Sequence, residues 1–175
     1  MQFLTPKESA QWCLQHGYPV TEDYAEPDLN VDNFIAGRFP IPSDAGKRIA
    51  LCRMLIESVW SQEPQCLLWT TQWSVWPSGE HFPLAQNVRH SFGEDRPLAD
   101  APGHIFHFGE IENALTFLVL SCLFLWDTSL MVSGGTTAIS LSHDEYGVVF
   151  SKQPTKIDEF RRRFAQFDIA FEKVS

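Results

Sequence analysis

A chain of 175 residues is long enough to bury a sizeable core as one domain and is short for two. Hydrophobic residues make up 44% of it and aromatic residues 13%, which argues against intrinsic disorder. The formal net charge of -9 argues against binding to nucleic acid or to anionic membrane surfaces, because both need a basic protein surface. We therefore expect one globular domain over residues 1–175, without a nucleic-acid or membrane partner.

The charge is unevenly distributed along the chain. Before Lys47 the only basic residues are Lys7 and Arg38, whereas the C-terminal region is rich in Lys and Arg. One interpretation is two solvated surfaces of opposite sign. The other is an acidic docking face for a basic protein partner, or head-to-tail self-association. The acidic residues before Lys47 are Glu8, Glu22, Asp23, Glu26, Asp28, Asp32 and Asp44.

The cysteines and the apolar segments indicate a cytoplasmic protein. No two cysteines have C-x-x-C spacing, and each lies among apolar residues, so we interpret all four as reduced core residues. The start of the chain lacks the pattern of a signal peptide. The longest apolar stretch, residues 114–126, is shorter than the roughly 20 residues of a membrane span, so we expect it in the core. The cysteines are Cys13, Cys52, Cys66 and Cys122.

Two helices are predicted in the first half of the chain. Thr5 and Glu8 form a capping-box pattern, and Gly17 supplies a stop for the helix that follows. A second helix, capped by Ser43, is predicted by apolar residues at helical spacing up to Trp60. The remaining predictions for this half are an acidic loop over 18–30, a short strand over 31–39 and a strand over 65–73.

The second half is richer in predicted strands. Ser133-Gly134-Gly135 is a strong hairpin signal. The predicted elements are helices over 84–92, 110–120 and 154–167, a turn over 101–104, and strands over 123–132, 136–142, 146–151 and 169–174. Early helices and late strands favour an α+β fold, with a mostly antiparallel sheet of four to six strands and helices packed on one face. The tail strand over 169–174 would form an edge, through which a homodimer could pair.

The first candidate site is the polar run of His143, Asp144 and Glu145 between two predicted strands. A general base or a metal site uses such groups. Adjacent residues of an extended chain point to opposite faces, so His143 and Asp144 can aim at one point only through a tight turn. The alternative is a polar hairpin turn in which Asp or Ser bonds local backbone amides.

His104, His107 and Glu110 form a second candidate, with the spacing i, i+3, i+6. On a helix this spacing brings possible metal ligands loosely together. The preceding Pro102 and Gly103 predict extended chain instead, which would split the two histidines between faces. We therefore predict no metal ion, and nothing in the sequence indicates a cofactor.

Trp73 and Trp76 form a third candidate. They lie where the predicted strand gives way to the loop signal Pro77-Ser78-Gly79. Aromatic residues in such a place line a pocket or a protein interface, where Trp is enriched, or simply pack against the core. Both interpretations remain open.

Asp127 is unusual because it directly follows the most apolar stretch of the chain. A carboxylate at that position should be paired or hydrogen-bonded, since burying it without a partner is costly. Arg89 and Arg96 are the candidate partners in a structural ion pair. The alternative is that Asp127 is a catalytic acid.

Three segments, in this order, resemble a group of uncharacterised bacterial proteins of similar length, and the likeness covers residues 65–150. The group's Gly before the Trp-Asp pair is Leu125 here. No activity is established for the group. The resemblance implies a bacterial origin and draws attention to Trp76, His104, Asp127 and His143 as one shared site. The segments are Trp73-Ser74-Val75-Trp76-Pro77-Ser78, Ala101-Pro102-Gly103-His104, and Trp126-Asp127 leading to Ser142-His143-Asp144-Glu145.

Two functional hypotheses remain, since the sequence lacks a nucleophile elbow, a phosphate-binding loop, a dinucleotide fingerprint and a zinc-protease motif. The favoured one is a non-catalytic binding protein whose acidic face takes a basic protein, as an immunity or inhibitor protein would. The alternative is a small enzyme with His143 or His104 as base and Asp127 or Asp144 as the orienting carboxylate. That enzyme requires these groups to converge in one cleft.

Overall fold

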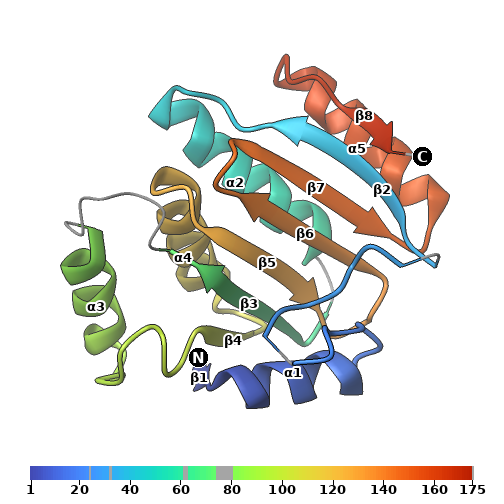
Figure 1. Ribbon diagram of the computed structural model, residues 1–175. Helices are drawn as coiled ribbons and strands as arrows, with labels where there is room; N and C mark the ends of the chain where they lie inside the picture. The colour runs from blue at the N-terminus through green and yellow to red at the C-terminus, as the bar shows by residue number, and fades with distance from the viewer. Residues whose placement is uncertain (24, 32, 61–62, 74–80, 175) are drawn as a thin grey trace.

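One antiparallel sheet runs through the computed structural model, which describes residues 1–23, 25–31, 33–60, 63–73 and 81–174 (Figure 1). The described strands are β1 (Gln2–Leu4), β2 (Ile35–Pro40), β3 (Gln65–Gln72), β4 (Gly103–His107), β5 (Asp127–Val132), β6 (Thr137–Ser142), β7 (Tyr146–Ser151) and β8 (Glu172–Val174). The described helices are α1 (Pro6–Gln15), α2 (Ala45–Val59), α3 (His81–Ser91), α4 (Ile111–Leu123) and α5 (Pro154–Gln166). The strand order is β1-β4-β3-β5-β6-β7-β2-β8, so the two ends of the chain form the two edges.

The α+β class and the antiparallel sheet are confirmed, but the prediction of four to six strands is wrong. The described chain has eight strands, and β1 and β4 account for the difference. β1 has three residues, too few to show a period of two. β4 is buried over Gly103–Phe106 on both faces, so its sequence does not alternate, and its Pro-Gly start is typical of a turn.

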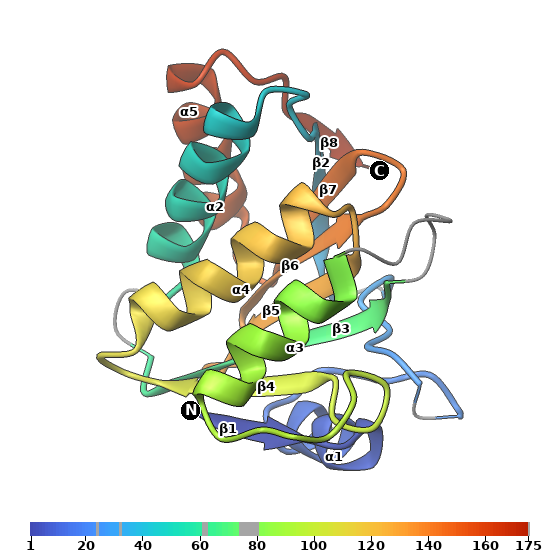
Figure 2. The same ribbon diagram turned by 90° about the vertical axis from the view of Figure 1, so that its left-hand side faces the viewer.

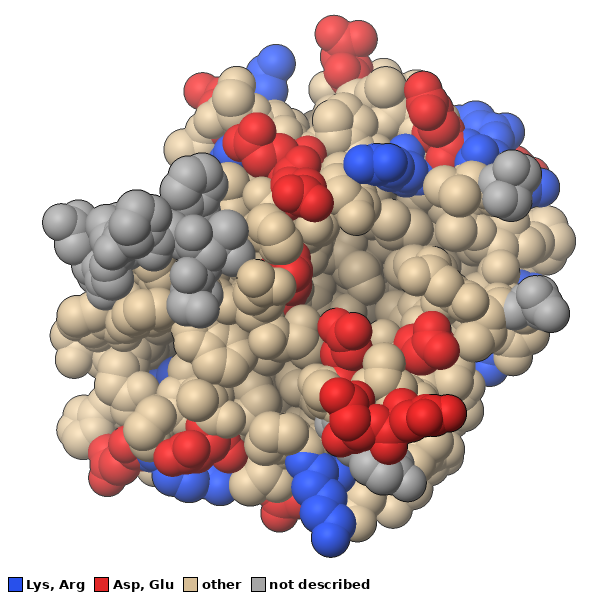
Figure 3. All heavy atoms as spheres, viewed as in Figure 1, with Lys and Arg blue, Asp and Glu red and all other residues tan. Residues whose placement is uncertain are grey.

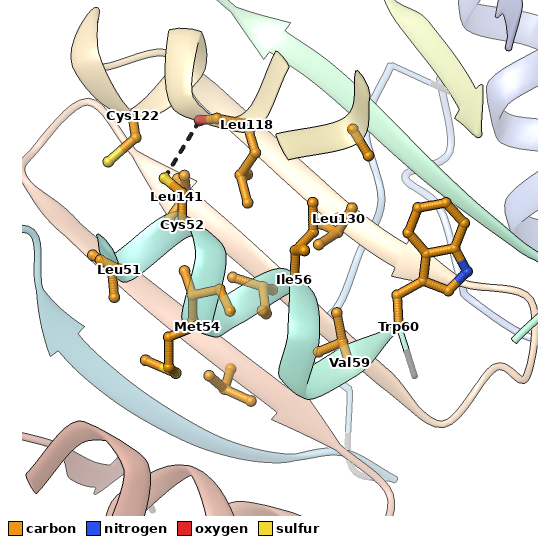
Figure 4. Packing of buried hydrophobic residues seen from close by; sticks show 14 of the residues in the cluster. Leu51, Cys52, Met54, Ile56, Val59, Trp60, Leu118, Cys122, Leu130 and Leu141 are labelled. Atoms are coloured by element: carbon orange, nitrogen blue, oxygen red, sulfur yellow. Dashed lines mark hydrogen bonds between the residues drawn. The ribbon is translucent and has the colours of Figure 1, made fainter. Parts of the chain in front are cut away.

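Three helices, α2, α4 and α5, cover one face of the sheet (Figure 2). The core between them and the sheet contains Leu55 and Ile56 of α2 and Leu118 of α4, each at most 1% exposed. Figure 4 shows α2 and α4 packed side by side, with the Cys52 thiol donating to the Leu118 carbonyl oxygen at 3.7 Å. All four cysteines are buried and free, as the sequence predicted. The apolar segment after residue 114 therefore lies inside the protein.

The expectation that the helices pack on one face is wrong for α1. Trp12 and Cys13 of α1 pack in a second core cluster with Leu67 and Trp69 of β3, on the face opposite to α2 and α4. β3 is buried on both faces, so its sequence does not indicate which face a helix covers. The Tyr18 hydroxyl fixes the chain after α1, because its oxygen lies 2.9 Å from the Val132 carbonyl oxygen of β5 and 2.7 Å from the Thr137 carbonyl oxygen of β6.

The predicted helix caps are confirmed for α1 and corrected for α2. The Thr5 hydroxyl accepts from the Glu8 amide and the Glu8 carboxylate accepts from the Thr5 amide, which is the predicted capping box. Gly17 ends α1 with a φ of 76°. The N-cap of α2 is Asp44 and not Ser43, because the Asp44 carboxylate accepts from the Lys47 amide at 2.8 Å.

The junction between α4 and β5 also differs from the prediction of a strand from residue 123. α4 continues to Leu123, and the strand begins at Asp127. The helix ends in a Schellman motif, in which the Trp126 amide donates to the Ser121 carbonyl oxygen at 2.9 Å. Leu125 occupies the left-handed position of this motif, with a φ of 52°. Gly is the residue that left-handed backbone favours at such a position.

The C-terminal strand is an edge strand, as predicted. β8 pairs with β2 and has no neighbour on its other side in the described sheet. Phe167, the last residue of the helix predicted over 154–167, follows α5 and is 40% exposed. None of the described helices combines the length and the apolar character that crossing a bilayer requires.

Candidate functional site

Asp127 and His143 form a hydrogen-bonded pair at one end of the sheet. Asp127 opens β5, and His143 lies in the turn between β6 and β7. The His143 amide donates to Asp127 Oδ1 at 2.7 Å, and His143 Nδ1 lies 2.9 Å from both carboxylate oxygens. The prediction that Asp127 is paired is confirmed, but the predicted arginine partners are wrong. The guanidinium of Arg96 binds Glu94 instead, and that of Arg89 binds backbone carbonyl oxygens.

The tight turn that the sequence required is present. Ser142 pairs with Tyr146, and Glu145 between them has a left-handed φ of 62°. The Asp144 amide donates to the Ser142 hydroxyl at 3.3 Å, which is the local bonding that a polar turn predicts. Through this turn Asp144 Oδ1 comes to 3.6 Å from His143 Nε2. His143 therefore lies between two carboxylates, in a turn that has the local bonding of a polar hairpin.

A groove of about 310 Å³ lies against this pair on the same face of the sheet as α1, since Leu29 and Phe150 of its lining belong to the core cluster of Trp12. Its floor comes from β5, β6 and β7, and its outer wall comes from residues 26–30. Figure 3 shows a hollow near the middle of this face, with acidic side chains along its lower rim and at its upper left. Six of the residues that line the groove are Glu26, Leu29, Asp127, Ser129, Ser140 and Tyr146. We call this feature the acidic groove.

The acidic loop predicted over residues 18–30 supplies the outer wall. Leu29 is 4% exposed and packs in the same core cluster as Trp12, which holds the loop against the sheet. Glu26 is exposed at the groove. Asp23 accepts hydrogen bonds from the Thr21 hydroxyl and the Ala25 amide, and these bonds lower the pKa of its carboxyl. These bonds therefore keep the Asp23 carboxyl of this loop ionised at neutral pH.

The floor of the acidic groove carries a pair of hydroxyls. Ser129 and Ser140 lie opposite each other on β5 and β6, and their hydroxyl oxygens are 2.8 Å apart. Ser129 is 8% exposed. On the β7 side, the Arg38 guanidinium stacks over the Tyr146 ring at 3.8 Å from its centre. No pattern in the sequence marks these four residues as a site, because polar residues in strands are ordinary unless their cross-strand partners are known.

His104 does not belong to this site, contrary to the arrangement that the resemblance implied. It packs against Phe106 and Phe117 on the opposite face of the sheet and is 1% exposed. Burial and, to a lesser degree, the neighbouring Arg89 guanidinium lower the pKa of His104 to about 3. Arg89 Nη1 donates to His104 Nε2 at 3.2 Å, which assigns the ring proton to Nδ1. His104 is a neutral core residue that supports Arg89.

The remaining candidates lie apart from the groove or outside the described residues. Trp73 is half-buried and lines a separate, mostly apolar cavity of about 490 Å³ beside α3. Trp76 lies outside the described residues. His107 is exposed at the end of β4, where its amide donates to the Glu110 carboxylate. Of the four residues that the resemblance drew together, the described structure brings together Asp127 and His143.

Within the described ranges, no group of three or more His, Cys, Asp or Glu side chains is arranged to hold a metal ion. Comparisons with protein-family models, with curated proteins and with solved structures found no match to this chain.

Proposed function

We propose that this protein is a binding protein whose acidic groove receives a basic segment of a protein partner. The observation that carries the proposal is the groove itself. It is a hollow of about 310 Å³ between carboxylates that are far apart in the sequence, Glu26 on one wall and Asp127 on the other. A cation that enters this hollow meets opposite charge from two sides.

Electrostatics favours a cationic partner. The chain has a net charge of -9, and between Lys7 and Arg38 it contains acidic residues but no Lys or Arg. Such a field steers positively charged partners and repels acidic ones, which acts mainly on the association rate and on specificity. Because the groove is partly closed, an ion pair that forms inside it is screened less by water and salt than an ion pair on the open surface.

The size of the groove limits what it can hold. A volume of about 310 Å³ accommodates one long side chain and part of its backbone, and it is too small for a folded element. The partner would therefore insert a side chain and rest its remaining surface on the acidic rim. Neutralisation of a basic toxin by an immunity-type protein is one biological form of this binding.

The proposal is tested by removing two carboxylates from the groove side. A short, dye-labelled peptide that alternates Arg and Lys with Gly is titrated with protein at low salt, and fluorescence anisotropy reports binding. We expect the double variant Glu26→Gln/Asp28→Asn to bind about five-fold more weakly, because each lost charge reduces the attraction. High salt should weaken binding by the wild type.

The control removes the same amount of charge from the opposite side of the molecule. Glu57 on α2 and Glu112 on α4 are exposed and lie near each other around Arg53. The double variant Glu57→Gln/Glu112→Gln should bind the peptide nearly as well as the wild type. Equal losses in the two variants would mean that only net charge matters, and the groove would then have no role.

A second candidate function, acid–base catalysis, is favoured by the contact between Asp127 and His143. A carboxylate that orients an imidazole through Nδ1 leaves Nε2 for proton transfer. Among the described residues, however, no hydroxyl or thiol is hydrogen-bonded to His143, so a nucleophile is not in place. Turnover of a cationic ester by the wild type, lost in His143→Gln with peptide affinity retained, would favour the enzyme. An inactive wild type would remove this candidate.

A further inference from the structure

We infer that the acidic groove selects an arginine side chain over a lysine side chain, an inference that rests on the proposed binding function. A guanidinium is planar and carries five hydrogen-bond donors, whereas an ammonium carries three donors around a point charge. A site with several separated acceptors and a flat wall therefore favours arginine. The groove has acceptors on two walls and on its floor.

The floor contributes unused hydrogen-bonding capacity. The hydroxyls of Ser129 and Ser140 share one hydrogen bond, which uses one hydrogen and one lone pair of the two groups. No other hydrogen bond of these two side chains is found among the described residues. Lone pairs on both oxygens thus remain free to accept from a ligand, although Ser129 is almost fully buried.

The two walls contribute carboxylate acceptors. The Glu26 carboxylate is not engaged by any other described side chain, and it lies at the groove. The Asp127 carboxylate accepts hydrogen bonds from His143. A carboxylate has about four acceptor sites, and the Asp127 side chain is 25% exposed, so it can accept further hydrogen bonds from a ligand. A guanidinium between these walls has donors for both carboxylates and for the hydroxyls of the floor.

The flat surfaces of the groove also suit a guanidinium. Tyr146 and Phe150 line it, and guanidinium groups stack on aromatic faces more readily than ammonium groups do. Arg38 of this chain already makes such a contact with one face of the Tyr146 ring, at 3.8 Å, so a ligand guanidinium would stack on the other aromatic surfaces of the groove. A guanidinium is also less strongly hydrated than an ammonium, so its entry into a partly closed groove costs less.

The test compares three capped peptides that differ at one side chain: Gly-Gly-Arg-Gly-Gly, the same peptide with Lys, and the same peptide with citrulline, a neutral analogue of arginine. Dissociation constants are measured by calorimetry at low salt. We expect the Arg peptide to bind at least about five-fold more tightly than the Lys peptide, and the citrulline peptide to bind weakest. The double variant Ser129→Ala/Ser140→Ala should reduce the preference for Arg over Lys. It removes both hydroxyls and leaves neither one unpaired.

Ser91→Ala on α3 is the matched control, because Ser91 is exposed and does not line the groove. The single variant Ser140→Ala gives the same readout if the double variant fails to fold. Equal affinity for Arg and Lys, or an Arg preference that survives the loss of both hydroxyls, would overturn the inference and leave the proposed binding function intact. Binding of none of the cationic peptides would overturn both.

Discussion

At the scale of single residues, burial decides what His104 does. A fully buried imidazole next to a guanidinium is held neutral, which is why its pKa falls to about 3 from an ordinary value near 6.5. The same burial lowers the pKa of Arg89 to about 10. The sequence presents His104 and His143 as equivalent candidates. Only the face of the sheet on which each one lies separates a core residue from a groove residue.

The depressed pKa of His104 predicts a loss of stability in acid. Above about pH 6.5 the imidazole is neutral in both the folded and the unfolded chain, so it has no effect on the pH dependence. Between about pH 6.5 and pH 3 the unfolded chain binds a proton that the folded chain does not. Stability then falls by up to about 1.4 kcal/mol per pH unit.

Urea unfolding at pH 7, 5 and 4 measures this effect. The variant His104→Gln should lose less free energy of unfolding between pH 7 and pH 4 than the wild type, because it lacks the titrating group. The carboxylates affect the free energy of unfolding equally in both proteins. The difference between the two slopes of that free energy against pH is therefore due to His104. Parallel slopes would contradict the neutral, buried imidazole.

At the scale of the elements, the sequence predicts the start of a helix well when only one residue can cap it. Thr5 and Glu8 form the capping box that their spacing predicts. Ser43 and Asp44 are both good capping residues in adjacent positions, and the sequence does not decide between them. The hydrogen bond from Lys47 selects Asp44.

The corrected cap of α2 is tested by a matched pair of substitutions. Asp44→Ala removes the acceptor of the Lys47 amide and should lower the free energy of unfolding by about 1 kcal/mol. Ser43→Ala alters an exposed residue outside the cap and should change it by less than about 0.5 kcal/mol. Chemical denaturation of the two variants and the wild type measures both values. A larger loss in Ser43→Ala would show that Ser43 caps the helix.

Elements that are buried on both faces are the hardest to predict from the sequence. The segment from 114 to 126 is apolar except for Thr116 and Ser121, so neither a period of two nor one of 3.6 marks where α4 ends and β5 begins. β4 has the same property and begins with a turn-like Pro-Gly pair. In such segments the tertiary packing determines the structure, and local preferences do not reveal it.

At the scale of the whole molecule, the candidate site depends on contacts between distant parts of the chain. The sequence singled out Asp127 and His143, and it predicted that the carboxylate would be paired. It did not indicate that they bind each other, because that contact depends on the register of β5 with β6. It also identified an acidic loop around Glu26, but the position of this loop over the sheet follows from the burial of Leu29.

The proposed binding site is tested most directly by amide NMR of the whole protein during titration with a short Arg-rich peptide. We predict that the shift changes concentrate on residues 26–30 and on the groove ends of β5, β6 and β7, and that they saturate together. Changes centred on α2 and α5, or the absence of saturable changes, would contradict the acidic groove as the site that receives a basic partner.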